Sequence, residues 1–258
     1  MTSPASAAHS YPHFLVVGVM KCGTSTVHEH ICTHPRVVRA FTKELHYFTR
    51  DFAGRVPLGS WSKEYHELLG WQGDPNDGML YGEASPSYIV VPQRLYDFNP
   101  DVKIIIMLRD PVTRALSQIR QYEEKSFRLK EGGYLAHMKS AADLSKVDVV
   151  LDSIYFNRVQ KFLDVFPPEN VAVVSFEELA SDPQAVMNEV FAFLNLDPVA
   201  IETGYVGAAT RKERTPEQQE IKSILTDYFF ENRGKLHQLL KARNARLIPS
   251  ASDWFDKY

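Results

Sequence analysis

The sequence predicts an α/β fold of three layers, in which helices flank a central parallel sheet. Two observations lead to this fold class: short apolar runs recur along the chain, and amphipathic segments separate them. The runs cover residues 14–17, 79–82, 102–108 and 171–175. Consecutive parallel strands need a long connection, usually a helix, so this alternation favours a parallel sheet over hairpins.

The helices are predicted from apolar residues that recur every three or four positions. This period is clearest over residues 112–122, 154–166 and 221–229. Asp182 and the proline after it open a further helix, which is expected to end at residues 195–198.

Other segments lack a clear period. Residues 52–78 and 126–150 are less regular, and residues 70–78 are predicted as a surface loop because turn residues dominate them. Residues 200–216 are predicted as a long loop before the terminal helices. Loops of that length are often functional.

The chain of 258 residues is long enough for one large α/β domain. We predict a flexible tail over residues 1–12 and a single domain over residues 13–258. The net charge of -3 gives no reason to expect binding to nucleic acid. Residues 1–12 lack the features of a secretory signal, and no apolar run approaches the roughly 20 residues of a spanning helix. We expect a cytoplasmic enzyme without a membrane anchor, although a chain trimmed of its anchor would fit equally.

The two cysteines, Cys22 and Cys32, are expected to be reduced. A helix between them would separate them by about 15 Å, which is too far for a disulfide. Cys22 lies at a predicted helix N-terminus, where a thiolate can be stabilised. No base stands next to it in the sequence, so we interpret Cys22 as a bystander thiol rather than a nucleophile.

The first apolar run leads into a loop that is typical of phosphate binding, which makes the predicted fold one of the P-loop type. Gly18 and Gly23 have the spacing of the G-x-x-x-x-G-K-[ST] loop, but Thr24 stands where the lysine should be. Lys21 lies inside the loop instead. Its ammonium is therefore expected beside the bridging side of a phosphate, with the hydroxyls and N–H groups of residues 24–26 aimed at the anion. The alternative is a strand-to-helix turn without a ligand.

A second anion-binding position follows the run 104–108, where Arg109 stands at the predicted carboxyl end of a buried strand. Ligands of open α/β sheets bind at this edge. Ser117 lies two helical turns further on, so Arg109 and Ser117 can share one phosphate. Pairing of Arg109 with Asp110 or another carboxylate is an equally good interpretation.

Residues 43–48 carry a candidate acid–base pair. Glu44 and His46 are two residues apart, which puts their side chains on the same side of an extended segment. One group can take a proton while the other orients or stabilises. The alternative is a solvated loop with no chemical role.

In this order, the segments resemble the sulfotransferases that use 3'-phosphoadenosine 5'-phosphosulfate (PAPS). The resemblance spans nearly the whole chain and is greatest to the branch of heparan sulfate N- and 3-O-sulfotransferases and their bacterial relatives. Four motifs carry it: the 5'-phosphosulfate loop, K-E-x-H-[FY]-F, G-E-x-[ST]-P-x-Y and the 3'-phosphate motif. They match residues 21–26, 43–48, 82–88 and 109–117, respectively.

The resemblance implies transfer of a sulfuryl group from PAPS to an acceptor by in-line displacement at sulfur. The acceptor group is expected to be a hydroxyl rather than an amine. It implies that Lys21 neutralises the charge that develops on the bridging oxygen as 3',5'-ADP (PAP) leaves. Glu44 is implied as the general base, provided that burial or neighbours raise its pKa toward the working pH. His46 is implied to hydrogen-bond to the sulfuryl group or the acceptor.

The resemblance also implies which residues bind PAPS. The 5'-phosphosulfate is assigned to Lys21, Cys22, Gly23, Thr24, Ser25 and Thr26. Arg109 and Ser117 are assigned to the 3'-phosphate. Family members close a basic loop over the nucleotide, and the candidates here are Arg211, Lys212 and Arg214. No metal is expected, since the reaction needs none and the sequence has no HExxH motif or Cys/His cluster.

Two departures concern the acceptor. Ala84 stands where the glycosaminoglycan enzymes carry a lysine, and Thr49 stands where the 3-O-sulfating branch has an aspartate. A smaller carbohydrate, a lipid or another natural product therefore fits at least as well as heparan sulfate.

Two other functions remain as alternatives. A P-loop kinase or NTPase would need a lysine after Gly23 and a metal-binding aspartate, for which only Asp110 is available. A catalytically inactive nucleotide-binding protein is disfavoured, because the candidate catalytic and binding residues are all present together.

Overall fold

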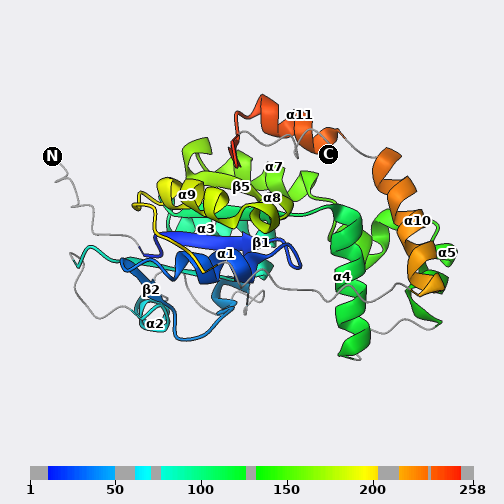
Figure 1. The fold of residues 1–258 in the computed structure, drawn as a ribbon, viewed down its shortest axis with the longest axis horizontal. Helices are drawn as coiled ribbons and strands as arrows, with labels where there is room; N and C mark the ends of the chain where they lie inside the picture. Colours follow the sequence, from blue (N-terminus) through cyan, green and yellow to red (C-terminus); the bar gives the residue numbers. More distant parts are fainter. Residues whose placement is uncertain are drawn as a thin grey trace.

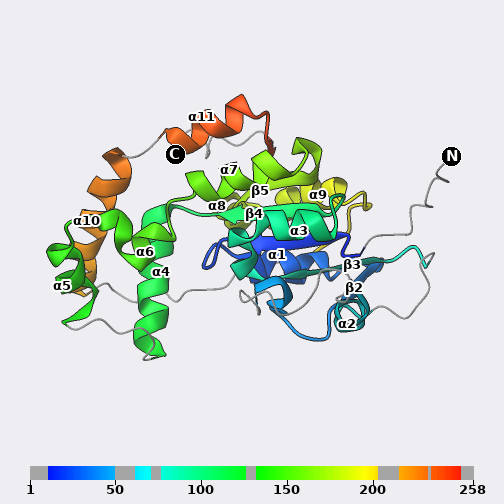
Figure 2. The same ribbon diagram turned by 180° about the vertical axis from the view of Figure 1, so that it is seen from behind.

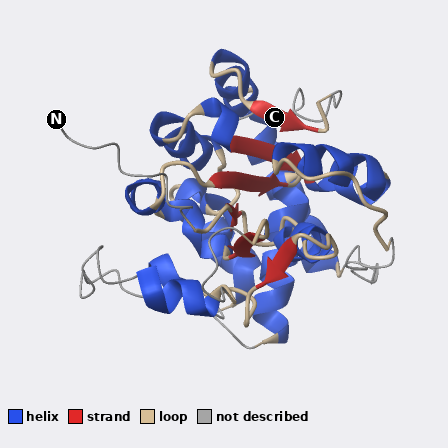
Figure 3. Ribbon diagram, turned by 90° about the vertical axis from the view of Figure 1, so that its left-hand side faces the viewer, coloured by secondary structure: helices blue, strands red, loops and turns tan. Residues whose placement is uncertain are grey.

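The fold is built on a six-stranded parallel sheet. The computed structural model describes residues 11–49, 62–70, 77–125, 132–202, 215–231 and 234–250. The strand order is β2-β3-β1-β4-β5-β6, and every neighbouring pair is parallel. Figure 3 shows helices on both sides of these strands, which confirms the predicted α/β class. The strands are β1 (Phe14–Gly18), β2 (Val37–Arg39), β3 (Leu80–Ala84), β4 (Lys103–Leu108), β5 (Val171–Ser175) and β6 (Arg246–Ile248).

Two helical layers cover the sheet (Figures 1 and 2). One layer contains α1 (Thr24–Ile31), α8 (Phe176–Ser181) and α9 (Pro183–Phe193), and the other contains α3 (Pro92–Phe98) and α7 (Phe156–Val165). Helix α11 packs against α7, and α2 lies near the β2 edge of the sheet. The bounds of these two helices are Lys235–Ala242 and Ser62–Leu68. The short 3-10 helices are η1 (Tyr47–Thr49), η3 (Pro86–Val90), η4 (Leu144–Lys146) and η5 (Pro168–Asn170).

A group of helices, called the helical lobe, extends to one side of the sheet, as Figures 1 and 2 both show. These helices are α4 (Pro111–Glu124), α5 (Gly133–Ser140), α6 (Asp148–Leu151) and α10 (Pro216–Glu231). They share a hydrophobic cluster that is separate from the sheet core and includes Leu225 of α10. Helix α4 begins directly after β4, so it connects this lobe to the carboxyl edge of the sheet.

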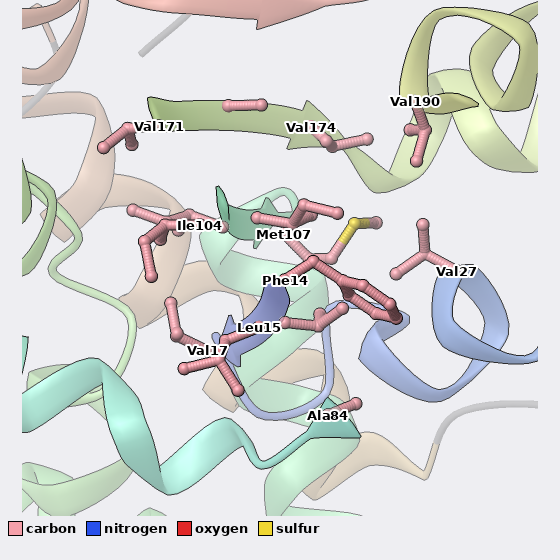
Figure 4. Close-up of a cluster of buried hydrophobic side chains, with 14 of the residues drawn as sticks. Phe14, Leu15, Val17, Val27, Ala84, Ile104, Met107, Val171, Val174 and Val190 are labelled. Carbon is pink, nitrogen blue, oxygen red and sulfur yellow. The ribbon is translucent and has the colours of Figure 1, made fainter. Parts of the chain in front are cut away.

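The main core lies between the sheet and the two helical layers. Figure 4 shows β1 side chains Phe14, Leu15 and Val17 packed near Ile104 and Met107 of β4. All five side chains are at most 1% exposed. Strands covered on both faces bury every side chain, which explains why β1, β4 and β5 are continuous apolar runs. Each large apolar side chain buried in this way contributes about 1.5–3 kcal/mol relative to an exposed one.

The predicted strands correspond to β1, β3, β4 and β5, with β3 displaced by about one to two residues. Strands β2 and β6 were not predicted. Each is three residues long and lies at an edge of the sheet, and each is only partly buried. Short edge strands therefore lack the long apolar run that identifies a central strand. The less regular region 126–150 contains α5 and α6, which are too short for a clear helical period.

Several sequence predictions fall on residues outside the described ranges. Residues 203–214 lie there, and with them Arg211, Lys212 and Arg214. Residues 1–10 of the predicted tail also lie there, whereas Tyr11 at its end is 4% exposed and the Pro12 carbonyl accepts a hydrogen bond from Asn99 at 2.9 Å. Across the described ranges, no helix has both the length and the apolar character needed to cross a membrane.

Candidate active site

A cavity of about 750 Å³ opens at the carboxyl ends of β1 and β4. Strand β1 leads to α1, and β4 leads to α4, so two loops and two helix N-termini meet there. Open α/β sheets bind ligands at this edge. The cavity lining includes these residues assigned from the sequence: Lys21, Gly23, Thr24, Ser25, Thr26, Glu44, His46, Arg109 and Ser117.

The loop before α1 has the backbone geometry of an anion cradle. Gly23 is the N-cap of α1 and has φ of 83°, in the left-handed region that favours glycine. A Cβ at Gly23 would also lie 2.6 Å from a ring carbon of Phe176, so a larger residue does not fit. Helix α1 begins at Thr24 and has no acidic residue in its first turn. Its first N–H groups have no acceptor within the helix and face an anion site favourably.

Lys21 brings a cation to this cradle. Its backbone is left-handed, with φ of 71°, and its side chain lines the cavity. Burial lowers the pKa of Lys21, and the nearby positive charges of Lys125 and Arg109 lower it further, while Glu124 acts in the opposite direction. The ammonium is therefore less stable here than in water, and a bound anion would offset part of that cost.

Cys22 differs from its neighbours in the loop. Its side chain is fully buried, and its Sγ lies 3.8 Å from the Tyr155 hydroxyl. Its backbone N–H donates to the Val19 carbonyl at 3.1 Å. Burial raises the pKa of the Cys22 thiol to about 12, so the thiol is protonated at neutral pH. This environment agrees with the interpretation of Cys22 as a bystander thiol.

Arg109 lies just after β4 and contacts the loop between β1 and α1, which we call the phosphate loop. Its Nη1 donates to the Lys21 carbonyl at 3.3 Å, and its Cζ lies 4.4 Å from the centroid of the Phe176 ring. Its Nε has no hydrogen-bond partner among the described residues, which leaves a donor unused. Within the same ranges, no carboxylate forms an ion pair with Arg109. Asp110 instead caps α4 by accepting from the Thr113 N–H at 2.7 Å.

A second arginine, Arg114, lies beneath the cavity and was given no role from the sequence. Its side chain is 0% exposed, yet its hydrogen-bond acceptors are neutral oxygens. Nε donates to Ser153 Oγ at 2.7 Å, and Nη1 donates to the Met20 carbonyl in the phosphate loop at 3.2 Å. Nη2 donates to the Val149 carbonyl at 2.9 Å and to Gln118 Oε1. Arg114 thus joins α4 to the phosphate loop and adds positive charge below the anion cradle.

On the opposite side of the cavity, Glu44 and His46 face each other. Glu44 Oε2 lies 3.4 Å from His46 Nε2, and Glu44 Oε1 lies 3.5 Å from Lys43 Nζ. The Glu44 side chain is 36% exposed. Both residues have left-handed backbones, with φ of 57° and 52°, so the segment is not extended as predicted from the sequence. Such conformations cost about 1–3 kcal/mol each in non-glycine residues, so other contacts must hold the segment.

Hydrogen bonds from the segment after β3 hold His46. Its ring Nδ1 lies 2.7 Å from Ser87 Oγ, and its backbone N–H donates to Ser85 Oγ at 2.9 Å. Ser87 Oγ also lies 2.8 Å from Thr49 Oγ1. The ring is therefore fixed at one nitrogen, while the other nitrogen faces Glu44. The cavity wall beside Glu44 and His46 also has an apolar part, which consists of Val19, Pro86, Ile89 and Val90.

Other cavity residues were missed in the sequence. Arg114 lies inside the segment 109–117, and Lys43 directly precedes Glu44. Their positions within these motifs were the one indication in the sequence that they lie near the cavity. Asp152, Arg158 and Phe176 were given no role, because they lie outside the four motifs and are distant from them in sequence. In the structure, Arg158 Nη2 forms an ion pair with Asp152 Oδ1 at 2.6 Å, and both residues line the cavity.

Comparison with known proteins agrees with this geometry. The family model described as "Sulfotransferase domain" matches residues 11–233. Heparan sulfate glucosamine 3-O-sulfotransferase 6 of Homo sapiens is 32% identical and aligns with 78% of this chain and 57% of its own length. The membrane-associated sulfotransferase kil1 of Dictyostelium discoideum is 24% identical over 89% of this chain and 65% of its own length. The chain thus spans about half to two thirds of the length of these curated relatives.

A solved structure is similar over nearly the whole chain. The crystal structure of a sulfotransferase from Alicyclobacillus acidocaldarius superposes with a TM-score of 0.67 and 28% sequence identity. The alignment covers 92% of this chain and 97% of that protein. The similarity therefore includes both the sheet and the helical lobe rather than the phosphate loop alone.

Proposed function

The chain belongs to the sulfotransferase family, and on that premise we propose that it transfers a sulfuryl group from PAPS to an acceptor hydroxyl. One observation carries the proposal: a single cavity contains Lys21 and the start of α1, and it also contains Arg109 and Arg114. Glu44 and His46 face each other on its opposite side. The acceptor is proposed to be a carbohydrate or a small natural product, and an amine is less expected than a hydroxyl.

The donor is proposed to lie along the cradle. Lys21 and the N–H groups at the start of α1 bind the 5'-phosphosulfate, while Arg109 and Ser117 bind the 3'-phosphate. The unused Nε of Arg109 and the lowered pKa of Lys21 support these roles, because both groups gain from a bound anion. Arg114 adds positive charge below the cradle without contacting solvent.

The reaction is proposed as a single in-line displacement at sulfur. The acceptor oxygen forms a bond to sulfur while the bond from sulfur to the bridging phosphate oxygen breaks. The acceptor proton passes to the Glu44 carboxylate, and PAP leaves with the bridging electron pair. Lys21 stabilises the charge on the leaving oxygen, and His46 hydrogen-bonds to the sulfuryl group or the acceptor.

The lining near Glu44 supports an acceptor with little charge. Val90 on this wall is 50% exposed, and Pro86 and Ile89 extend the same apolar surface. Among the described residues on this side of the cavity, Lys43 provides the one ammonium, and it pairs with Glu44. A polyanionic glycan would gain more from a broad basic surface than from such a wall.

Calorimetric titration with PAP and with ATP tests the donor. We expect tight binding of PAP without a metal ion and weaker binding of ATP. Magnesium-dependent binding of ATP with no preference for PAP would instead support a P-loop kinase or NTPase. A screen with radiolabelled PAPS and neutral glycosides, hydroxylated natural products and heparan oligosaccharides tests the acceptor. PAP binding without transfer to any acceptor would favour an inactive nucleotide-binding protein.

Beside the residue roles proposed above, three further sequence-based assignments stay predictions. They are the single domain over residues 13–258, the cytoplasmic location and the closing role of Arg211, Lys212 and Arg214.

A further inference from the structure

The motif at residues 82–88 has no role in the reaction as described, yet its glutamate lies at the centre of a buried hydrogen-bond network. We propose that Glu83 is a positioning residue, which holds the backbone of residues 43–48 so that Glu44 and His46 face the cavity. This inference rests on the proposed sulfuryl transfer. It goes beyond that function because Glu83 lies outside the cavity lining and contacts no reacting group.

The Glu83 carboxylate accepts hydrogen bonds from four donors although its residue is 1% exposed. Oε2 accepts from the Leu45 N–H at 3.1 Å and from Ser85 Oγ at 2.6 Å. Oε1 accepts from the Tyr65 hydroxyl at 3.1 Å and from the Tyr88 hydroxyl at 2.6 Å. These donors come from the segment before η1, from α2, and from η3 with its N-cap Ser85. One carboxylate therefore ties three separate parts of the chain together.

The segment held by Glu83 needs such a tie. Leu45 lies between two left-handed residues, Glu44 and His46, and its own side chain is 1% exposed in the core. Its N–H donates to Glu83, and the next N–H, that of His46, donates to Ser85 Oγ at 2.9 Å. Ser85 in turn donates to Glu83. Two consecutive backbone N–H groups thus depend on the same carboxylate, one directly and one through Ser85.

A carboxylate suits this position better than an amide does. Leu45 offers a backbone N–H, which can only donate, and a glutamine has one acceptor oxygen instead of two. In one orientation the amide NH₂ would point at the Leu45 N–H, and in the other it would face the two tyrosine hydroxyls. Burial raises the pKa of Glu83, while the hydrogen bonds from Ser85, Tyr88, Tyr65 and Leu45 act in the opposite direction. The network is therefore arranged to favour the acceptor form.

Hydrogen exchange in the free protein tests the anchor without any substrate. In Glu83→Gln we expect the amides of Leu45 and His46 to exchange at least about tenfold faster, as expected when a buried hydrogen bond is lost. Val190→Ala serves as the stability control, because Val190 is 0% exposed on α9 and lies outside the network. It should leave exchange at Leu45 and His46 unchanged relative to other amides. Unchanged exchange in Glu83→Gln would overturn the proposal.

A double-mutant cycle tests whether Glu83 acts through Glu44. We expect Glu83→Gln to lower kcat by about tenfold or more while the Kd for PAP stays within about twofold. In a Glu44→Gln background, the same change should lower kcat less, by about threefold, since only the contribution through His46 is left. General structural damage would instead lower kcat equally in both backgrounds and weaken PAP. That result would refute the positioning role.

Ser85→Ala keeps the test available if Glu83→Gln does not fold. It removes one hydroxyl from a fully buried side chain and breaks the link from the His46 N–H through Ser85 Oγ to Glu83, while the direct hydrogen bond from Leu45 to Glu83 stays. We expect faster exchange at the His46 amide and a kcat lowered by roughly threefold to tenfold, with no more than about a twofold effect in a His46→Ala background. Equal losses in both backgrounds would contradict the proposal. If the unaltered protein transfers no sulfuryl group from PAPS, the proposed function fails, whereas the exchange results still decide whether Glu83 holds the segment.

Discussion

The two sides of the cavity are built in different ways. The side that we propose binds PAPS, called the donor side, uses the carboxyl ends of β1 and β4, each followed by a loop and a helix. The side that we propose binds the acceptor, called the acceptor side, uses residues 43–48 and the segment that follows β3, which contain only 3-10 helices. The donor side therefore obtains its geometry from the sheet, and the acceptor side obtains its geometry from side-chain hydrogen bonds.

The two sides also differ in charge, although both contain left-handed non-glycine residues, Lys21 on the donor side and Glu44 and His46 on the acceptor side. On the donor side, Lys21, Arg109 and Arg114 gather where helix N-termini already favour an anion. On the acceptor side, Glu44 and His46 take left-handed conformations that the contacts with Ser85, Ser87 and Glu83 maintain. We expect donor-side changes to act on PAP affinity and acceptor-side changes to act on turnover.

The largest effect is expected for Glu44→Gln. Loss of the general base should lower kcat by about 100-fold or more, while the Kd for PAP changes little because Glu44 faces the acceptor. Steady-state kinetics with an accepted hydroxyl compound and calorimetry with PAP measure the two quantities. Glu67→Gln on α2 removes the same charge from an exposed position and should leave both unchanged. A Glu44→Gln enzyme within a few-fold of the unaltered one would remove Glu44 from the role of base.

Arg109→Ala tests the donor side. Loss of a charged hydrogen-bonding partner should weaken PAP by about 2 kcal/mol or more, which is roughly 30-fold in Kd. Arg36→Ala is the matched control, because this substitution also removes one positive charge. Arg36 is an exposed arginine directly before β2. Calorimetry on both variants separates a direct contact from the general effect of charge. Unchanged PAP affinity in Arg109→Ala would refute its assignment to the 3'-phosphate.

Sequence patterns predicted the donor side better than the acceptor side for a physical reason. The loop after β1 and the arginine after β4 follow continuous apolar runs, and the carboxyl ends of parallel strands meet at one edge. Local sequence was therefore enough to bring Lys21 and Arg109 into one region. Arg114 was missed because a helical arginine is usually exposed, and only the packed lobe shows that this one is buried.

The acceptor side depends on contacts that no local pattern specifies. Leu45 and Glu83 are 38 residues apart, and His46 and Ser87 are 41 residues apart. Left-handed backbones at Glu44 and His46 could not be predicted, because residues other than glycine adopt them in only a few per cent of cases. The sequence comparison singled out the segment containing Glu83, but it did not indicate that this carboxylate is buried. The edge strands β2 and β6 were missed for a similar reason. Each is identified as a strand by its pairing with β3 or β5, and not by a pattern in its own sequence.

The pH dependence of PAP binding should separate Lys21 from the arginines. Burial lowers the pKa of Lys21, and only the protonated ammonium attracts the anion, so affinity should be lost as the pH rises through that lowered pKa. The loss should begin below the ordinary lysine range and reach at most about tenfold per pH unit. Guanidinium groups stay charged over this range. Calorimetry from pH 7 to about pH 10 should show this loss in the unaltered protein but not in Lys21→Arg. The same alkaline loss in both proteins would assign it to another group.

The smallest effect is expected where an aromatic ring supports the donor side. Phe176 lies under the Arg109 guanidinium, with 4.4 Å from Cζ to the ring centroid, and it also packs against Gly23. Phe176→Leu keeps an apolar side chain but removes the ring face, so PAP affinity should fall by roughly two- to fivefold, the scale of one cation–π contact. Phe193→Leu is the matched control, because Phe193 lies below Lys103 and Arg246, at 5.3 Å from each, and outside the cavity lining. It should lower stability without changing the Kd for PAP. If Phe176→Leu lowers kcat but not PAP affinity, the division between a donor side that binds and an acceptor side that reacts is wrong at this residue.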